Sequence, residues 1–344
     1  MHKNIEVEDF GSFQGQKIKL ISLQNQKGTQ LQCLTLGATW HSLRIADKNG
    51  RTLDAVIGPK DLKGYLNQFE TTPYFFGATI GRYAGRISEG CFILDDTPYI
   101  LNTSQSTHLH GGMESFAKKV WEIHEIREGI EPQVTLSYFS PHLEGGFPGN
   151  LQVKAKYTLT ETDEVKIEYS ARADEDTVLN LTNHVYLNLG RESILEHQLQ
   201  INADARLELD SNLLPTGKML PIEGTPYDFR NSDLLNKVDT INGLDDVFVL
   251  NKANANLITY RAPSPGLQLD IQTNQPSAVV FAPKSINFEG ELKSNVLAHT
   301  KYPAICFETQ NFPDAPNHPH FPIALLKKGE VYSNTTQYVF SIMD

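Results

Sequence analysis

The sequence predicts an all-β protein, built as one large antiparallel β domain with few short helices. Apolar and polar residues alternate with a period of two from one end of the chain to the other, as in strands with one solvated face. Amphipathic helical patterns are scarce, and no Gly-rich loop joins a strand to a long helix, which argues against dinucleotide and P-loop sites. Pro and Gly are spread evenly without a linker, so we expect residues 1–344 to form a single domain.

The clearest strands lie in the middle of the chain. Alternation over residues 151–159 resumes at 165–171 after the polar segment 161–164, which predicts a β-hairpin. Residues 201–209 and 267–271 alternate in the same way. Short apolar or β-branched runs typical of buried strands lie at residues 135–139, 278–281 and 337–342. Short helices are expected only at residues 61–67 and 232–238.

Charge and cysteine content exclude several classes of protein. The 30 Lys and Arg residues against 41 Asp and Glu residues give a net charge of -11, which argues against a nucleic-acid partner. No stretch has the length of apolar sequence that a membrane span needs. The three cysteines are widely spaced and form no CxxC pair, so a disulfide scaffold and a structural zinc site are not expected. With no signal peptide visible, we expect a cytoplasmic protein whose partner is a small molecule.

Two segments rich in glycine, arginine and histidine carry candidate site residues. Residues 76–87 (FGATIGRYAGRI) contain Arg82 and Arg86. Arg86 either presents its donors to an oxygen ligand or belongs with Arg82 on the surface of a glycine-bent strand, and the pattern alone favours the second interpretation. On a strand, His108 and His110 would share one face, as a metal pair does. A hydrogen-bonded histidine beside a glycine turn is the favoured interpretation, because nothing nearby completes a ligand set.

Residues 180–190 (NLTNHVYLNLG) form a dense row of hydrogen-bonding side chains. In strand geometry, one face carries Asn180, Thr182, His184, Tyr186 and Asn188. This face either borders a wet cleft or is an ordinary solvent face, and the sequence does not decide between them.

Glu308 follows the apolar run at residues 302–306. A carboxylate at the end of a buried strand is costly unless it is paired or functional. The alternative interpretation is a strand end that reaches solvent. His318 and His320 also resemble a metal pair, but the prolines around them favour a rigid loop.

Together these segments resemble the aldose 1-epimerase family, whose members are also called galactose mutarotases. The matching motifs, in chain order, are residues 77–82 with 86–87, 109–112, 180–189, 243–245, 273–276 and 308–315. The resemblance implies a large antiparallel β supersandwich that uses neither a metal nor an organic cofactor.

The resemblance also implies a role for each matched residue. Glu308 corresponds to the general base and His184 to the general acid, and His110 to a histidine that contacts the sugar near its ring oxygen. The other matched positions hold hydroxyls or line the pocket: Arg86, Asp245, Gln275, Tyr186 and the aromatic Phe281.

Two positions depart from the family pattern. Gly85 stands where many members have Asn, so a hydrogen bond to the sugar is expected to be absent. Asp246 stands where members often have His, and we expect it to face solvent, since two adjacent pocket carboxylates would raise each other's pKa.

The implied function is the interconversion of the α and β anomers of free hexoses such as galactose and glucose. A carboxylate removes the O1 proton while an imidazolium protonates the ring oxygen, and we expect a bell-shaped pH profile with Glu308 on the acid limb and His184 on the alkaline limb. The protein is expected to be a monomer or homodimer.

Three rival functions stay open. A glycoside hydrolase needs two carboxylates. A non-catalytic sugar-binding module would normally lose Glu308 or His184. A hexose-6-phosphate 1-epimerase would want further cations near C6 of the sugar, where Arg82 is available.

Overall fold

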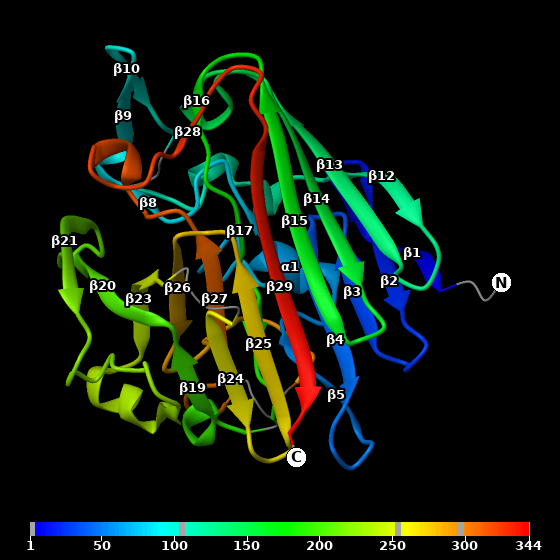
Figure 1. Cartoon of the computed structure of the whole chain (residues 1–344). Coiled ribbons are helices and arrows are strands. Elements are labelled where there is room, and N and C mark those ends of the chain that lie inside the picture. The colour runs from blue at the N-terminus through cyan, green and yellow to red at the C-terminus, as the bar shows by residue number, and fades with distance from the viewer. Residues whose placement is uncertain (1–3, 103–106, 191, 252–255, 295–298, 344) are drawn as a thin grey trace.

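The computed structural model describes residues 4–102, 107–190, 192–251, 256–294 and 299–343. Its architecture is three large antiparallel sheets, and long strands run side by side through the middle of the molecule (Figure 1). The nine-stranded sheet has the order β12 (Glu122–Arg127), β13 (Gln133–Ser140), β14 (Leu151–Leu159), β15 (Glu164–Ala173), β29 (Tyr332–Ile342), β25 (Leu267–Thr273), β24 (Ile258–Ala262), β19 (Gln198–Ile201) and β22 (Asp233–Leu234).

The seven-stranded sheet carries much of the candidate site described below. Its order is β21 (Pro215–Pro221), β20 (Ala203–Leu209), β23 (Leu244–Leu250), β26 (Ser277–Ala282), β27 (Ile305–Gln310), β18 (Tyr186–Leu187) and β6 (Val56–Ile57). The five-stranded sheet consists of β1 (Ile5–Phe13), β2 (Gln16–Gln24), β3 (Gln30–Leu34), β4 (Thr39–Ala46) and β5 (Thr52–Asp54).

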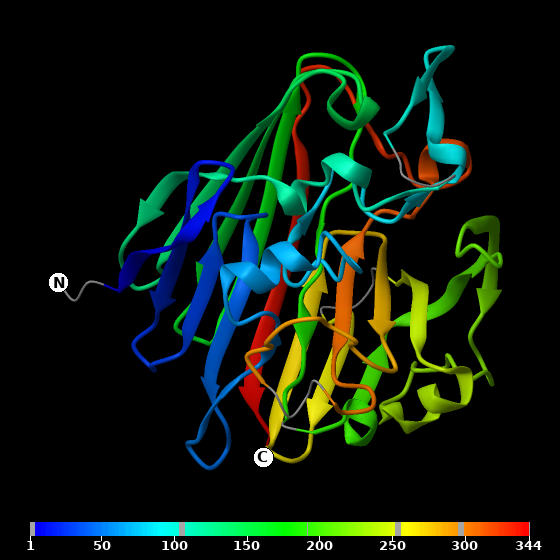
Figure 2. The ribbon, with the colours of Figure 1, turned by 180° about the vertical axis from the view of Figure 1, so that it is seen from behind.

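Four two-stranded ladders complete the described sheets. They are β9 (Cys91–Leu94) with β10 (Thr97–Ile100), β8 (Arg86–Ile87) with β11 (His108–Leu109), β16 (Thr177–Val178) with β28 (Leu325–Leu326), and β7 (Thr79–Ile80) with β17 (Thr182–Asn183). Helix α1 (Leu62–Asn67) lies in front of the sheets in the reverse view (Figure 2). Within the described ranges, no helix is long and apolar enough to cross a membrane.

The structure confirms the predicted strands. The hairpin at residues 151–171 is β14 and β15, paired from Leu151 opposite Ala173 to Leu159 opposite Val165. Its inward side chains join the main core, because alternate residues of a strand point to opposite faces. In that core, the ring of Trp40 packs edge-on against Tyr338 at 5.1 Å.

The two helix predictions have different outcomes. Asp61 caps α1, because its side chain accepts a hydrogen bond from the backbone N–H of Gly64, so the first prediction is confirmed. The second segment begins with the short strand β22 and continues as a 3₁₀ helix at Leu235–Ile241, which buries Leu235 and Val238.

The row of polar residues at 180–190 forms neither a continuous strand nor a solvent face, so the solvent-face interpretation was wrong. It is broken into β17 and β18, which pair with different sheets, and its polar residues are buried. The amide of Asn180 donates to the carbonyls of Ala84 and Asn311. These side chains therefore satisfy buried backbone groups where regular pairing stops.

Arg82 was wrongly expected on the surface. It is 2% exposed, and its guanidinium donates to the hydroxyl of Ser140 and to the carbonyls of Ser140, Pro141, Pro148 and Gly149 at 2.8–2.9 Å. The planar fork of donors suits this convergence of carbonyls. Arg82 therefore ties two loop segments together inside the protein.

Candidate active site

Several predicted site residues meet in one enclosed cavity at the seven-stranded sheet. Its lining consists of Gly85, Arg86, His110, Leu209, Leu213, Asp245, Val247, Val279, Glu308 and Pro313. The cavity has a volume of about 30 Å³, close to that of one water molecule.

Glu308 and His184 form the centre of the site. Glu308 lies on β27, whose six residues are all buried, and His184 lies between β17 and β18. The distance from Oε1 of Glu308 to Nε2 of His184 is 3.5 Å, and their side chains are 2% and 6% exposed. The resemblance predicted this pair, and the structure brings the two residues together from distant parts of the chain.

Burial controls the proton distribution of this pair. It raises the pKa of the Glu308 carboxyl well above its usual value, and the nearby Asp245 raises it further while Arg86 opposes the change. Burial lowers the pKa of His184 to about 4. Without a ligand the shared proton therefore favours Glu308, which leaves both groups neutral, because a buried site disfavours charge.

His110 faces the same cavity as a neutral hydrogen-bond donor. The backbone N–H of Gly85 donates to Nδ1 of His110 at 3.2 Å, so the ring proton of the neutral imidazole sits on Nε2. Burial, followed by the neighbouring His184 and Arg86, lowers the pKa of His110 well below its ordinary value. An Nε2–H donor in this position suits a sugar oxygen.

The proposed face shared by His108 and His110 does not exist. Strand β11 ends at Leu109, and His110 adopts a left-handed conformation with φ of 50°. His108 instead packs its buried ring edge-on against Phe147 at 5.5 Å. The turn continues into Gly111, where a Cβ atom would lie 1.9 Å from the carbonyl oxygen of Gly81, so only glycine fits.

One group of described residues has the spacing of a metal site. Side-chain atoms of His110, His184 and Glu308 all lie within 4.8 Å of one another. A metal-binding imidazole normally donates its second N–H to an acceptor. Here Nδ1 of His110 accepts from Gly85, and Nδ1 of His184 has no hydrogen-bond partner among the described residues. This donor set fits hydrogen bonding to a substrate better than metal ligation.

Arg86 and Asp245 add opposite charges to the lining. Arg86 lies on β8, directly opposite Leu109 of β11, and Asp245 lies on β23. Burial raises the pKa of Asp245, and the positive charge of Arg86 opposes that rise. Both residues were predicted to hold hydroxyls, and both line the cavity.

Aromatic rings surround His184. Tyr186 stacks on its imidazole with ring centroids 5.2 Å apart, and Phe281 lies edge-on to both rings at 6.1 Å. Strand pairing places Phe281 opposite Asp245, which fixes this aromatic wall beside the cavity.

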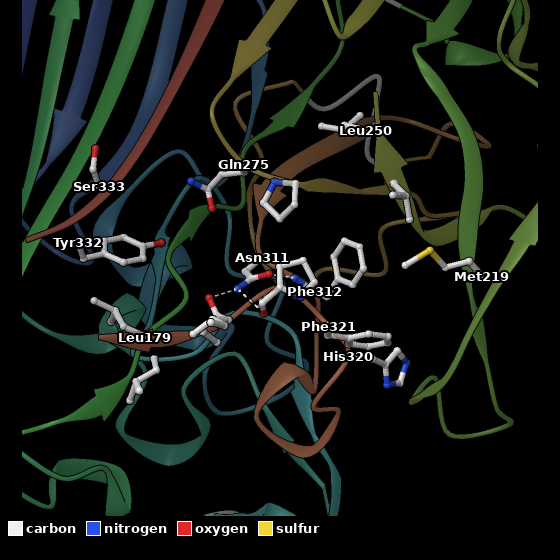
Figure 3. Close-up of a pocket in the computed structure, with 16 residues that line it drawn as sticks. Leu179, Met219, Leu250, Gln275, Asn311, Phe312, His320, Phe321, Tyr332 and Ser333 are labelled. Carbon is white, nitrogen blue, oxygen red and sulfur yellow. Dashed lines mark hydrogen bonds between the residues drawn. The ribbon is translucent and has the colours of Figure 1, made fainter. Parts of the chain in front are cut away.

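Gln275 lies outside this cavity. It lines a neighbouring groove of about 720 Å³ together with Asn311, Phe312 and Tyr332 (Figure 3), and its amide donates to Asn274 at 2.7 Å. Strand pairing places Val279 opposite Glu308. Gln275 is not among the residues that line the cavity beside the pair, and its assignment as a hydroxyl contact stays a prediction.

Asp246 was wrongly expected to face solvent. It is 8% exposed and lies 3.0 Å from the guanidinium of Arg206, which in turn sits over the ring of Tyr227 at 3.9 Å. Alternation along β23 turns Asp246 away from the cavity that Asp245 lines, and Arg206 compensates its charge.

The structure also explains Gly85. Its φ is +80°, and a Cβ atom there would lie 2.9 Å from the ring of Pro313 and 3.2 Å from Nε2 of Gln310. These neighbours occupy the space that a side chain at this position would need.

Sequence reasoning missed several apolar residues of the site. The residues are Phe75, Leu209, Leu213, Val247 and Val279. Four of them line the cavity, and Phe75 packs against both histidines. Their sequence patterns match those of core residues, so no local signal separates them from the core.

Comparisons with known proteins identify a family that this chain matches. A sequence profile of the family described as Aldose 1-epimerase matches residues 19–339. The galactose mutarotase of Sus scrofa is 38% identical over 323 residues, covering 91% of either chain. The aldose 1-epimerase of Haemophilus influenzae is 33% identical over 350 residues and covers 98% of this chain and 99% of its own.

Solved structures show the same fold. The galactose 1-epimerase of Lactobacillus acidophilus has a TM-score of 0.87 at 26% identity, covering 99% of both chains. A GalM/aldose epimerase homologue from C. elegans has a TM-score of 0.85 at 29% identity, covering 94% of this chain and 99% of its own. The predicted antiparallel β fold class is confirmed.

Proposed function

The chain belongs to the aldose 1-epimerase family, and from this we propose that it is an isomerase that interconverts the α and β anomers of free hexoses. The observation that carries the proposal is the buried contact between Glu308 and His184 at 3.5 Å, within reach of a cavity lined by Arg86, His110 and Asp245. A base and an acid that face one small site suit ring opening and closure of a sugar.

In the proposed mechanism, Glu308 takes the proton of O1 while His184 gives a proton to the ring oxygen. The C1–O5 bond breaks and an open-chain aldehyde forms. After rotation about C1–C2, His184 takes the proton back and Glu308 returns one to O1, which closes the ring on the other face. Each positioned group is expected to contribute about 10²- to 10⁴-fold to the rate.

The pair carries one proton throughout this cycle. Ring opening starts from the minor form of the pair, in which the proton has passed from Glu308 to His184, and it converts this ionised Glu308 and protonated His184 into two neutral groups. A buried site disfavours charge, so the environment assists that step. We also propose that the Nε2–H of His110 donates to the sugar near its ring oxygen, a role that the contact of its Nδ1 with Gly85 supports.

The structure bears on the rival functions. Arg82 is occupied by backbone carbonyls, and Arg86 is the single cationic side chain in the described cavity lining, which favours a free hexose over a sugar phosphate. Asp245 and Glu308 supply two carboxylates, as a glycoside hydrolase requires. Release of reducing sugar from an aryl glycoside would support that rival.

We further propose that the chain acts as one catalytic domain, as a monomer or homodimer, in the cytoplasm. Its partner is a hexose, with no role for nucleic acid or a membrane. The location is supported by Cys33, Cys91 and Cys306, which are all free thiols, as a reducing compartment maintains.

Polarimetry tests the activity directly. Freshly dissolved α-glucose and α-galactose are followed with and without the protein, and we expect faster decay of optical rotation for at least one of them. A protein that accelerates neither sugar would overturn the proposed function, whatever its fold.

A further inference from the structure

Phe75 packs against both histidines of the candidate site. Its ring centroid lies 5.2 Å from that of His110 at an interplanar angle of 67°, and 6.0 Å from that of His184 at 31°. The two imidazoles are 5.4 Å apart at 79°. The three rings therefore form one cluster in which each ring contacts the other two, and Phe75 is only 6% exposed.

The backbone next to Phe75 also holds the main chain of His184. The N–H of Ala78 donates to the carbonyl of Phe75 at 2.9 Å and closes a turn. Within that turn, the N–H of Gly77 donates to the carbonyl of His184 at 2.9 Å, and the N–H of His184 donates to the carbonyl of Ala78 at 3.0 Å. The ring of Phe75 and the backbone of His184 are thus fixed by the same few residues.

Phe75 adopts a backbone conformation that suits glycine. Its φ is 54°, in the left-handed region where a bulky non-glycine residue is a genuine outlier. Such strain persists where the surrounding structure enforces it, and it clusters at functional sites. Glycine would adopt this conformation without strain. The backbone conformation gives no reason for a phenylalanine at this position, so the contribution of Phe75 is its aromatic ring.

We propose that Phe75 is a positioning residue, which sets the ring planes of His110 and His184 and keeps water away from the acid side of the site. This inference rests on the acid role proposed for His184. The Nδ1 atom of His184 has no hydrogen-bond partner among the described residues, so water that entered beside the ring would find an open position.

The titratable and charged groups around His184 come from several elements. They are Glu308 on β27, Arg86 on β8, Asp245 on β23, Tyr186 on β18 and His110 directly after β11. A substitution at Phe75 leaves all of them in the chain. Because these charges are unchanged, a shift in the pKa of His184 would report a change in the hydration or orientation of its ring.

The test replaces the planar ring with a flexible side chain that still fills space, Phe75→Met. We expect kcat to fall by about tenfold or more, since small displacements of catalytic groups are costly, while KM stays within about twofold. In NMR titrations without sugar, the pKa of His184 should rise from about 4 toward its ordinary value. The matched control is Phe10→Met, because Phe10 packs edge-on against His41 at 5.4 Å, outside the site. The control should change neither kcat nor the His184 titration.

Unchanged kcat and unchanged His184 titration in folded Phe75→Met would overturn the proposal. If that variant does not fold, Phe75→Tyr decides, because it keeps the ring. A Tyr variant that keeps the wild-type kcat and the wild-type pKa of His184 supports the proposal. A folded Tyr variant that loses both overturns it. The NMR titration needs no substrate, so it measures the effect of the Phe75 ring on His184 even in a protein without mutarotase activity. Absence of that activity in the wild-type protein would overturn the proposed function alone.

Discussion

Oε1 of Glu308 lies 3.5 Å from Nε2 of His184, and neither side chain has appreciable contact with solvent. The two groups titrate as a coupled pair, because a charge on one changes the cost of a charge on the other. The proposed mechanism requires in both directions that this pair holds one proton. The contact therefore determines the expected effects of substitution and of pH.

Replacement of Glu308 by Gln removes the proposed base and preserves the shape of the side chain. We expect the polarimetric rate to fall by about 10²- to 10⁴-fold with little change in folding. The control is Glu291→Gln, at an exposed carboxylate that pairs with Lys60. Near-normal turnover of the Glu308 variant would contradict the assignment of Glu308 as the general base.

Replacement of His184 by Asn removes the proposed acid. We expect kcat to fall by about 10²- to 10⁴-fold, whereas His110→Asn should act mainly on KM. Steady-state polarimetry over a range of sugar concentrations separates the two effects. If His184→Asn changes only KM and His110→Asn removes turnover, the roles of the two histidines are exchanged.

The pH profile of the rate should be bell-shaped, with His184 controlling the acid limb and Glu308 the alkaline limb. Free side chains would give the opposite assignment. Burial raises the pKa of Glu308 and lowers that of His184 to about 4. As pH falls, the pair therefore gains its second proton on His184, at about pH 4. As pH rises, it loses its last proton from Glu308. NMR of the His184 ring during acid titration checks the first limb, and titration of His184 near its free value would contradict this order.

Arg82 is expected to stabilise the fold without contacting substrate. Arg82→Met leaves several buried carbonyls without a donor, and we expect a loss of at least about 3 kcal/mol in the free energy of unfolding. Urea denaturation measures this loss. The control is Arg172→Met, at an exposed arginine that donates to Gly329. Impaired turnover of a phosphorylated sugar, at normal stability, would restore Arg82 as a site residue.

Gln275 provides a test of the site boundaries. A substrate confined to the cavity does not reach the amide of Gln275, and in that case Gln275→Ala should leave kcat/KM within about twofold, whereas Asp245→Ala should lower it by about tenfold or more through lost hydroxyl contacts. Polarimetry with galactose compares the variants. Equal losses in both would show that substrate reaches Gln275.

Much of the fold was predictable, because period-two alternation reports directly on strands with one buried face. The hairpin of β14 and β15 is an example. The segment around His184 was not, since its side chains bond to backbone carbonyls that only the tertiary structure brings near. Glu308 stood out as a lone carboxylate after an apolar run. Phe75 gave no signal, because an aromatic residue of the site and one of the core have the same local pattern.

The position of β29 bears on how the protein matures during synthesis. This strand joins β15 to β25 in the middle of the nine-stranded sheet, so the two halves of the sheet have no direct ladder until residues 332–342 have been made. The nine-stranded sheet can therefore close only after residues 332–342 have left the ribosome. Until then, the facing edges of β15 and β25 carry unpaired backbone groups, which are sites for aggregation. The nascent protein should depend on chaperones more than a chain with sequential pairing does.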